Sequence, residues 1–584
     1  MTPQSSLKVN HRNAEFCCCK RTSNGAVDVA DDNRSAGTVL KQELLVTFEN
    51  FSGLRAVRTA AYLKSMVGMA HSEFLHKNPR HFMVVMLAGV HQNGRKFGVF
   101  AKRPQQRCCL HLVRSRSNND MDRVNHTSPY NDEHMIFRGT LLHEHYIMVL
   151  FTEAMKVAFH PTPSILRLEF DLAEDDGVYT EHISMVESEF RVELPFNVDI
   201  DAIHPDHLAL IVLLAAHPFI GSSLHIPLNV SERFALSTDL ISRYKVTYAG
   251  RSVPPYVPPD SSRPGLAFSG GADSTAALLV MPENTLSVFM DRPFRKKTSL
   301  YNKSAALATI KHAQKEGYDV KTIACDVEYV RSPLGFPTDL VPSIPLLAIA
   351  AEEGINSIAF GTVMESAYRI GHEKARDYAT SHHHRFWGRL FQAAGVPLYL
   401  PVAGVSEVGT SSIVMNSSFY DYTRSCIRGT WPDACENCWK CFRKNMLDAA
   451  LKKEPVNDTY LRRGLAIKEV KLKIQHWPVS HENVLAWSLQ QAEGNISNLL
   501  MARFEGSSRD LSYLEGYFPP SLSLMPEAYR SHTEERLNHY LYPLGEEWFD
   551  TVRTHTMTSW LNSASALEAR EKFSAFMDRE FPRD

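Results

Sequence analysis

The chain has 584 residues, of which 44% are hydrophobic and 22% are charged. This length is too great for one hydrophobic core and predicts two or three domains, and the composition is that of an ordinary soluble protein. With 63 Lys and Arg against 65 Asp and Glu, the formal net charge is −2. A charge so close to zero argues against a nucleic-acid partner held by a global basic field.

No segment predicts a membrane anchor or a secretion signal. The longest apolar run, at 208–216, has nine residues, whereas a helix needs about 20 to span a bilayer. The first residues, MTPQSSLKVNHRNAEF, lack the apolar core of a secretory signal. We therefore expect a cytoplasmic protein with no membrane partner, in which clustered cysteines serve metals or catalysis more often than disulfides.

The first half of the chain predicts a polar tail and a strand-rich domain. Residues 1–38 are polar and aperiodic, and we expect them to be disordered. In 39–250, short apolar runs separated by Gly, Asn, Asp and Pro indicate strands, and 203–219 predicts a buried helix bounded by prolines. The role of this domain is open. The stretch 251–265, which contains five prolines, predicts a stiff linker.

Residues 266–450 predict a doubly wound α/β domain. Apolar runs alternate with helical stretches at the spacing of βαβ units, which implies a parallel sheet with helices on both faces. The predicted strands are GLAF (265–268), TLSVFMD (285–291), VKTIACD (320–326), NSIAFGT (356–362) and VPLYLPV (396–402). Residues 451–584 show helical spacing and predict a mostly helical C-terminal region.

The first of these strands ends in Ser-Gly-Gly-Ala-Asp-Ser, residues 269–274, before an apolar helix. Glycines allow backbone amides to surround an anion, and the helix directs its positive end to the same place. Ser269 and Ser274 can donate hydroxyl hydrogen bonds, and Asp273 beside a phosphate calls for a bridging Mg²⁺. The segment is neither a Walker A loop nor GxGxxG. An ordinary capped turn is the alternative.

Four cysteines downstream have the spacing C-x8-C-x2-C-x2-C: Cys426, Cys435, Cys438 and Cys441. Four thiolates suit tetrahedral Zn²⁺ with no open coordination position, so we expect a structural zinc site. An iron–sulfur cluster accepts the same ligands and is the alternative. The cysteine runs at 17–19 and 108–109 lack the spacing of metal ligands.

The SGGADS motif resembles the signature of the PP-loop, or N-type, ATP pyrophosphatases, which cleave ATP between the α and β phosphates and adenylylate a substrate. With the four cysteines, the segment 265–450 is similar to the 7-cyano-7-deazaguanine synthases, whose zinc site has nearly the same spacing. The first gap of this chain is one residue longer than theirs. These compact synthases lack the N- and C-terminal regions of this chain. The resemblance implies an adenine-nucleotide α-hydrolase-like fold.

The resemblance also implies roles for individual residues and three cofactors: ATP, Mg²⁺ and structural Zn²⁺. The residues that would hold the pyrophosphate are Ser269, Gly270, Gly271, Asp273 and Ser274. Of these, Ser269, Asp273 and Ser274 would act in catalysis. Asp291 and Arg292, after the second strand, would lie near the adenosine.

The segment 363–391 follows the fourth strand, and ligands of open α/β sheets bind beyond the carboxyl ends of the strands. The residues that could face an acceptor substrate are Glu365, Ser366, Tyr368, His372 and Arg385, and a solvated helix is the alternative for each. Three consecutive histidines, 382–384, do not share a helix face, and we expect them at the surface. Ser406 and Glu407, after the fifth strand, would cap a helix or approach the acceptor.

These features predict an ATP-dependent ligase that adenylylates a carboxylate or amide oxygen of a small molecule, releases pyrophosphate and then admits ammonia or an amine. One alternative is an RNA-modifying sulfur transferase, which would want a free catalytic cysteine; Cys325 is the candidate that this domain offers. Another is a non-catalytic ATP-binding module. The sequence leaves a homodimer open.

Overall fold

The computed structural model describes residues 154–195, 202–295, 301–490, 492–505 and 509–582, together with five short strands between residues 100 and 150. The predicted tail at 1–38 and the cysteines at 17–19 and 108–109 lie outside the described residues. Within the described part, no helix has both the length and the apolar character needed to cross a bilayer.

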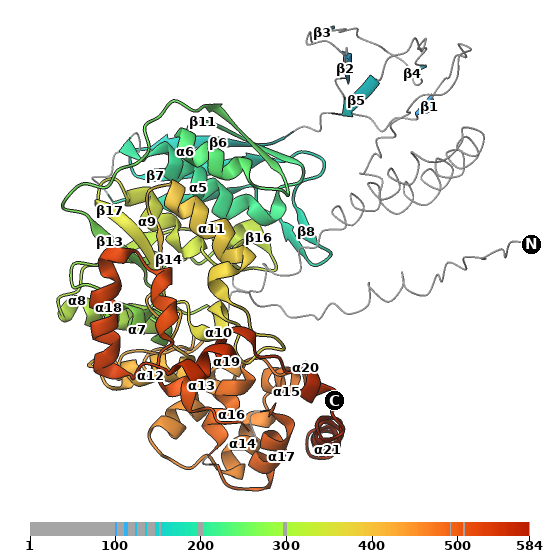
Figure 1. Ribbon diagram of the computed structural model, residues 1–584, viewed down its shortest axis with the longest axis vertical. Coiled ribbons are helices and arrows are strands. Elements are labelled where there is room, and N and C mark those ends of the chain that lie inside the picture. The colour runs from blue at the N-terminus through green and yellow to red at the C-terminus, as the bar shows by residue number, and fades with distance from the viewer. Residues whose placement is uncertain are drawn as a thin grey trace, which may run out of the picture.

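The N-terminal part contains a five-stranded mixed sheet in the order β10-β7-β6-β11-β12 (Figure 1). Its strands are β6 (Met155–Thr162), β7 (Ile165–Asp171), β10 (Glu189–Glu193), β11 (Ser223–Asn229) and β12 (Lys245–Gly250). The predicted buried helix is confirmed as α5 (Pro205–Ala216), in which every residue from Asp206 to Ala216 is buried. Helix α6 (Glu232–Asp239) follows α5 in this part.

A second sheet, parallel throughout, follows in the order β15-β14-β13-β17-β18. Its strands are β13 (Arg263–Ala267), β14 (Leu286–Asp291), β15 (Val320–Ala324), β17 (Ile355–Phe360) and β18 (Leu398–Tyr399). All five predicted strands are therefore confirmed. The chain starts in the middle, runs to one edge and then crosses to the other, so the topological switch point lies between β13 and β17.

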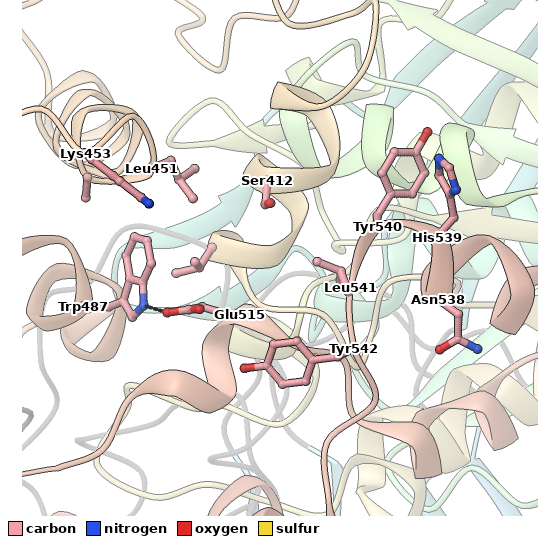
Figure 2. A pocket seen from close by; sticks show the side chains of 12 residues that line it. Ser412, Leu451, Lys453, Trp487, Glu515, Asn538, His539, Tyr540, Leu541 and Tyr542 are labelled. Carbon is pink, nitrogen blue, oxygen red and sulfur yellow. Dashed lines mark hydrogen bonds between the residues drawn. The ribbon is translucent and has the colours of Figure 1, made fainter.

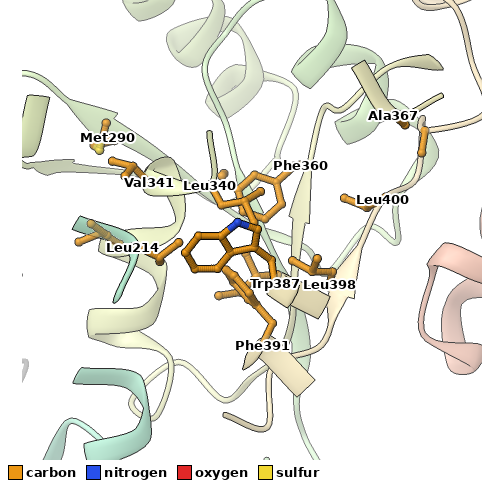
Figure 3. Close-up of a cluster of buried hydrophobic side chains, with 14 of the residues drawn as sticks. Leu214, Met290, Leu340, Val341, Phe360, Ala367, Trp387, Phe391, Leu398 and Leu400 are labelled. Carbon is orange, nitrogen blue, oxygen red and sulfur yellow. The ribbon is translucent and has the colours of Figure 1, made fainter. Parts of the chain in front are cut away.

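Helices cover both faces of the parallel sheet, as a doubly wound fold requires. They are α7 (Ala272–Val280), α8 (Ser304–Lys315), α9 (Ile344–Ile349) and α11 (His382–Ala393). Alternate side chains of β13 enter two different cores, because Leu266 packs with α7 whereas Ala267 packs on the opposite side. On that opposite side, Figure 3 shows Trp387 of α11 among side chains that include Leu214 of α5 and Leu398.

The two sheets adjoin at the outer strand β15. An isolated antiparallel bridge joins Val192 of β10 to Cys325, and β16 (Arg331–Ser332) pairs with β9 (Ile183–Met185). The proline-rich stretch is docked as well, because the buried Tyr256 donates to the carbonyls of Ala350 and Ile355, each at 3.1 Å. The largest cluster of buried hydrophobic side chains therefore contains residues from both sides of the predicted domain boundaries. The boundaries themselves remain predictions.

The C-terminal region is helical, as predicted, and lies at the opposite end of the molecule from the N-terminal sheet (Figure 1). Its helix α18 (Glu527–Tyr540) returns to the parallel sheet, where Arg536 donates to the carbonyl of Leu279 at the end of α7. Besides α11 and α18, the α-helices of the described residues from 364 onward are α10 (Met364–Ala367), α12 (Glu407–Met415), α13 (Trp439–Leu451), α14 (Asp458–Leu465), α15 (Lys468–Ile474), α16 (Glu482–Leu489), α17 (Asn495–Arg503), α19 (Phe549–Thr554), α20 (Thr558–Leu561) and α21 (Ala564–Glu580).

Candidate functional site

The segment 269–274 forms the turn from β13 into α7, at the carboxyl end of the central strand and beside the switch point. Gly270 has φ +71°, and a Cβ there would lie 3.0 Å from the Cα of Ala306 in α8, so this position requires glycine. The hydroxyls of Ser269 and Ser274 lie 2.9 Å apart, and Ser274 is also 3.1 Å from the carbonyl of Gly271. The two serines therefore hold the turn closed.

Gly271 is in a different situation from Gly270. Its φ is −88°, which any residue adopts, and the nearest atom to an added Cβ is the Ser269 hydroxyl at 3.6 Å. As the N-cap of α7 it also brings no side chain to cap the first turn. The first-turn amides of α7 therefore have no side-chain acceptor within the described residues, and they carry the positive end of the helix dipole.

Three other segments contact the loop near Asp273, which lies in the first turn of α7. Thr410 of α12 donates to its Oδ1 at 2.9 Å, and the Nζ of Lys444 in α13 lies 3.8 Å from the same oxygen. Gly361, just after β17, packs so closely that a Cβ there would lie 2.6 Å from the amide nitrogen of Ser274. The loop is thus fitted against α12, α13 and the end of β17.

Glu407, at the start of α12, is the centre of a buried charge cluster. Ser406 caps this helix, as predicted, by accepting from the amides of Val408 and Gly409. The Glu407 carboxylate is 4% exposed. Its basic partners are Arg443 at 3.1 Å, Lys444 at 2.9 Å and His481 at 2.9 Å. Burial opposes ionisation of Glu407, but the charges of Arg443 and Lys444, with the contact from His481, outweigh it and hold the pKa of Glu407 well below the usual range.

Glu365, in α10, lies against this cluster, and its pKa is shifted in the opposite direction from that of Glu407. It is fully buried, and its Oε2 accepts from the backbone amide of Glu407 at 3.0 Å. Burial and the charge of Glu407 raise the pKa of Glu365 to about 8. A neutral carboxylic acid therefore lies beside an ionised carboxylate, and such a separation of pKa values is typical of functional sites.

Of the other residues predicted to face an acceptor substrate, only some lie near the Glu407 cluster. The rings of His372 and His481 are 6.1 Å apart, and burial, followed by the nearby His481, lowers the pKa of His372 to about 3. Tyr368 is 1% exposed and packs edge-on against Phe518 in the core. Arg385 is exposed and donates to the carbonyl of Thr380 at 2.7 Å, and no described contact links it to the loop.

Asp291 and Arg292, for which the resemblance implies a place near the adenosine, lie at the carboxyl end of β14, the strand beside β13. Both carboxylate oxygens of Asp291 are 2.7 Å from the Nζ of Lys303. The Arg292 guanidinium is 3.1 Å from Glu328 and lies over the ring of Tyr301, 3.3 Å from its centroid. Both side chains are therefore held by protein partners.

Two further predictions need comment. The expectation that all three histidines of 382–384 are surface residues is wrong for His383, which is 7% exposed and lies 3.0 Å from both the Asp339 carboxylate and the Tyr378 hydroxyl. Cys325 is fully buried, and burial raises its pKa to about 12. A thiol in this environment is not poised to act as a nucleophile.

The four cysteines form a compact cluster in which all Sγ atoms lie within 4.8 Å of one another. The Sγ atoms of Cys435 and Cys441 are 3.7 Å apart, and a tetrahedral site with Zn–S bonds of about 2.3 Å places its sulfurs roughly 3.8 Å apart. The amides of Arg428, Gly429 and Cys435 donate to the sulfur of Cys426. The donor set and its spacing fit a structural zinc ion.

Sequence reasoning missed the cations that face the loop. Arg443 and Lys444 lie two and three residues after Cys441, and with Lys440 they fall at helical spacing on α13. This spacing was readable from the sequence. His481 was not, because nothing local marks it as a partner of Glu407.

A pocket of about 560 Å³ opens beside another face of α12 (Figure 2). Val408 and Ser412 of α12 help to line it, and Trp487 donates to the Glu515 carboxylate at 2.9 Å across its wall. No residue of 269–274 lines this pocket. It is therefore separate from the loop.

Comparison with known proteins finds one family model, a family of unknown function (DUF6395), which matches residues 386–556. The matched segment contains Glu407, the four cysteines and His481, and it begins after the 269–274 loop. No curated protein and no solved structure matches the chain significantly.

Proposed function

We propose that residues 269–274 bind the phosphates of ATP and that the protein is an ATP-dependent ligase of the PP-loop ATP pyrophosphatase type. The SGGADS motif supports this proposal through its resemblance to that family. The observation that carries it is the environment of Gly271, at the N-terminus of α7 and beside the switch point of the parallel sheet.

The fold itself does not require glycine at position 271, since the backbone is ordinary and an added Cβ would meet only an ordinary contact with the Ser269 hydroxyl at 3.6 Å. A ligand that must approach the backbone closely does require it. The uncapped first turn of α7 favours an anion there, because its amides and its dipole both point to negative charge. A polyphosphate satisfies all of these conditions.

Asp273 supplies the second part of the argument. Thr410 and Lys444 both approach its Oδ1, and its side chain is 31% exposed. Within the described part of the chain, its Oδ2 has no hydrogen-bond partner. A carboxylate oxygen next to a phosphate site is a natural ligand for Mg²⁺.

The proposed reaction has two steps. A carboxylate or amide oxygen of the acceptor bonds to the α-phosphorus of ATP as the bond between the α and β phosphates breaks and pyrophosphate leaves. Ammonia or an amine then attacks the activated carbon, a C–N bond forms and AMP departs with its electron pair. The loop amides and the helix terminus stabilise charge on the leaving pyrophosphate, so the contribution of the protein is electrostatic and positional.

The test is incubation of the protein with Mg²⁺, ATP labelled at the α phosphate, and candidate acids and amines. Labelled AMP with pyrophosphate supports the proposal, and labelled ADP rejects it. Asp273→Asn should abolish AMP formation, whereas Asp239→Asn, at an exposed aspartate of α6, should not. Binding of ATP without turnover would identify a nucleotide-binding module, and AMP formed only with RNA and a sulfur donor would identify a sulfur transferase.

For the four cysteines we propose zinc as the resident metal and a structural role. When bound, the ion would tie the segment around Cys426 to the start of α13. Metal analysis should find one zinc per chain. Visible absorption with stoichiometric iron and labile sulfide would instead identify an iron–sulfur cluster.

A further inference from the structure

Helix α13 starts in the cysteine cluster and extends to the phosphate-binding loop proposed above. Cys438 is its N-cap, and the sulfur of Cys438 accepts from the amide of Cys441 at 3.4 Å. Lys440 and Lys444 are four residues apart and therefore share one side of the helix. On that side, the Nζ of Lys444 lies 3.8 Å from the Asp273 carboxylate.

A second connection joins the cluster to the loop through α8. The hydroxyl of Thr309 lies 3.1 Å from the carbonyl of Gly270 and 3.0 Å from the carbonyl of Tyr422. The amide of Trp431 donates to the Ser304 hydroxyl at 2.9 Å. The segment that carries Cys426 is therefore bound to the same helix that packs against Gly270. The cysteine cluster and the loop form one structural unit.

The cations on α13 differ in how they are neutralised. Arg443 and Lys444 share the buried carboxylate of Glu407. Lys440 is exposed, and among the described residues no carboxylate lies within ion-pair distance of it. It lies one helical turn before Lys444, on the side of α13 from which Lys444 approaches Asp273. Lys440 is thus a positive charge beside the loop that the protein leaves available.

We propose that Lys440 binds phosphate oxygens of the polyphosphate held at residues 269–274, and that the cysteine cluster fixes its position at the start of α13. This inference rests on the proposed function, since it names a further residue of the same site. An ammonium group with three donors suits a phosphate chain as a mobile point charge. Lys444, held by Glu407, serves instead to orient Asp273.

The experiment measures equilibrium binding of ATP, inorganic tripolyphosphate and AMP to the zinc-loaded full chain. Lys440→Ala should weaken ATP and tripolyphosphate about tenfold, as expected for loss of one charge-assisted contact, and should leave AMP binding nearly unchanged. Lys440→Arg should restore most of the affinity. The matched control is Lys452→Ala, on the same helix, where the lysine pairs with Asp448 at 2.9 Å.

The outcomes separate this inference from the proposed function. If Lys440→Ala binds ATP and tripolyphosphate as the wild type does, the inference is overturned and the ligase proposal stands. If the wild type binds tripolyphosphate but not ATP, and Lys440→Ala weakens tripolyphosphate binding, the inference stands and the proposal that ATP is the ligand is rejected. Binding of neither ligand overturns both. Loss of zinc, or equal loss of AMP and tripolyphosphate affinity, would show a merely structural role for Lys440 and overturn the inference.

Discussion

Lys444 and Asp273 lie 3.8 Å apart, although one belongs to the helix that follows the four cysteines and the other to the turn after the first strand of the parallel sheet. Glu407 completes the contact, because its carboxylate is 2.9 Å from the same Nζ. The helix that follows the cysteine cluster and the loop are therefore joined through one set of charges. A change in either should be felt by the other.

Gly271→Ala tests whether a ligand, and not the fold, requires glycine at this position. The free energy of unfolding should fall by less than about 1 kcal/mol, because the backbone is ordinary and the added methyl group has room. Affinity for ATP should fall at least about tenfold, because the methyl group would occupy space that a phosphate needs. Chemical denaturation and equilibrium binding measure the two effects.

Gly361→Ala is the contrasting variant, since its Cβ would lie 2.6 Å from the amide nitrogen of Ser274. It should lower stability and ATP affinity together by displacing the first turn of α7. Equal behaviour of the two variants in both measurements would contradict the distinction drawn between these glycines.

Glu365→Gln should change how stability depends on pH. Because the pKa of Glu365 is raised to about 8 in the folded protein, the folded state binds more protons than the unfolded state between the ordinary carboxyl pKa and about pH 8. Its stabilising contribution is therefore complete below the ordinary pKa and is lost as the pH rises through about 8. The glutamine variant lacks this loss and should gain a few kcal/mol over the wild type at about pH 9.

Urea denaturation of both proteins from about pH 5 to about pH 9 provides the measurement. The stability difference should grow with pH and level off above about 8. A difference that is constant over this range would show that Glu365 is already ionised at neutral pH.

Arg443→Met should be strongly destabilising, by about 3 kcal/mol, because it removes one cation from the buried carboxylate of Glu407. Arg251→Met is the matched control: its bond to Asp239 is also short, at 2.8 Å, but both side chains are well exposed. That exposed pair should contribute less than about 1 kcal/mol. Similar losses in the two variants would mean that burial does not strengthen the Glu407 cluster.

Removal of the metal should lower the melting temperature by about 10 °C, because the start of α13 would lose its attachment to the segment around Cys426. Affinity for tripolyphosphate should fall at the same time, since Lys440 is one residue from Cys441. Calorimetry and binding after chelation, followed by zinc restoration, measure both. A metal-free protein with unchanged melting temperature and affinity would separate the cluster from the loop.

The sequence predicted the parallel sheet well, because each strand is a short apolar run followed by a turn. It also placed the SGGADS turn correctly at the carboxyl end of β13. These features depend on local patterns, and β13 differs from its predicted range by at most two residues at either end.

The charge cluster could not be predicted in the same way. Glu407, Lys444 and His481 come from three different helices or their ends, and their partnership depends on how those elements pack. Arg385 illustrates the converse: its position after the fourth strand suggested a role in the site, but its guanidinium binds the nearby carbonyl of Thr380. Position along the chain indicates an edge of the sheet and does not determine where a long side chain points.

The bridge between Val192 and Cys325 has a consequence for self-association. β15 is the outer strand of the parallel sheet, and an outer strand with open amides and carbonyls recruits strands from other molecules. β10 covers β15 at this point, and the opposite outer strand, β18, is only two residues long. A truncated chain starting at residue 251 would expose β15 and should aggregate. The N-terminal sheet therefore protects β15 from pairing with strands of other molecules.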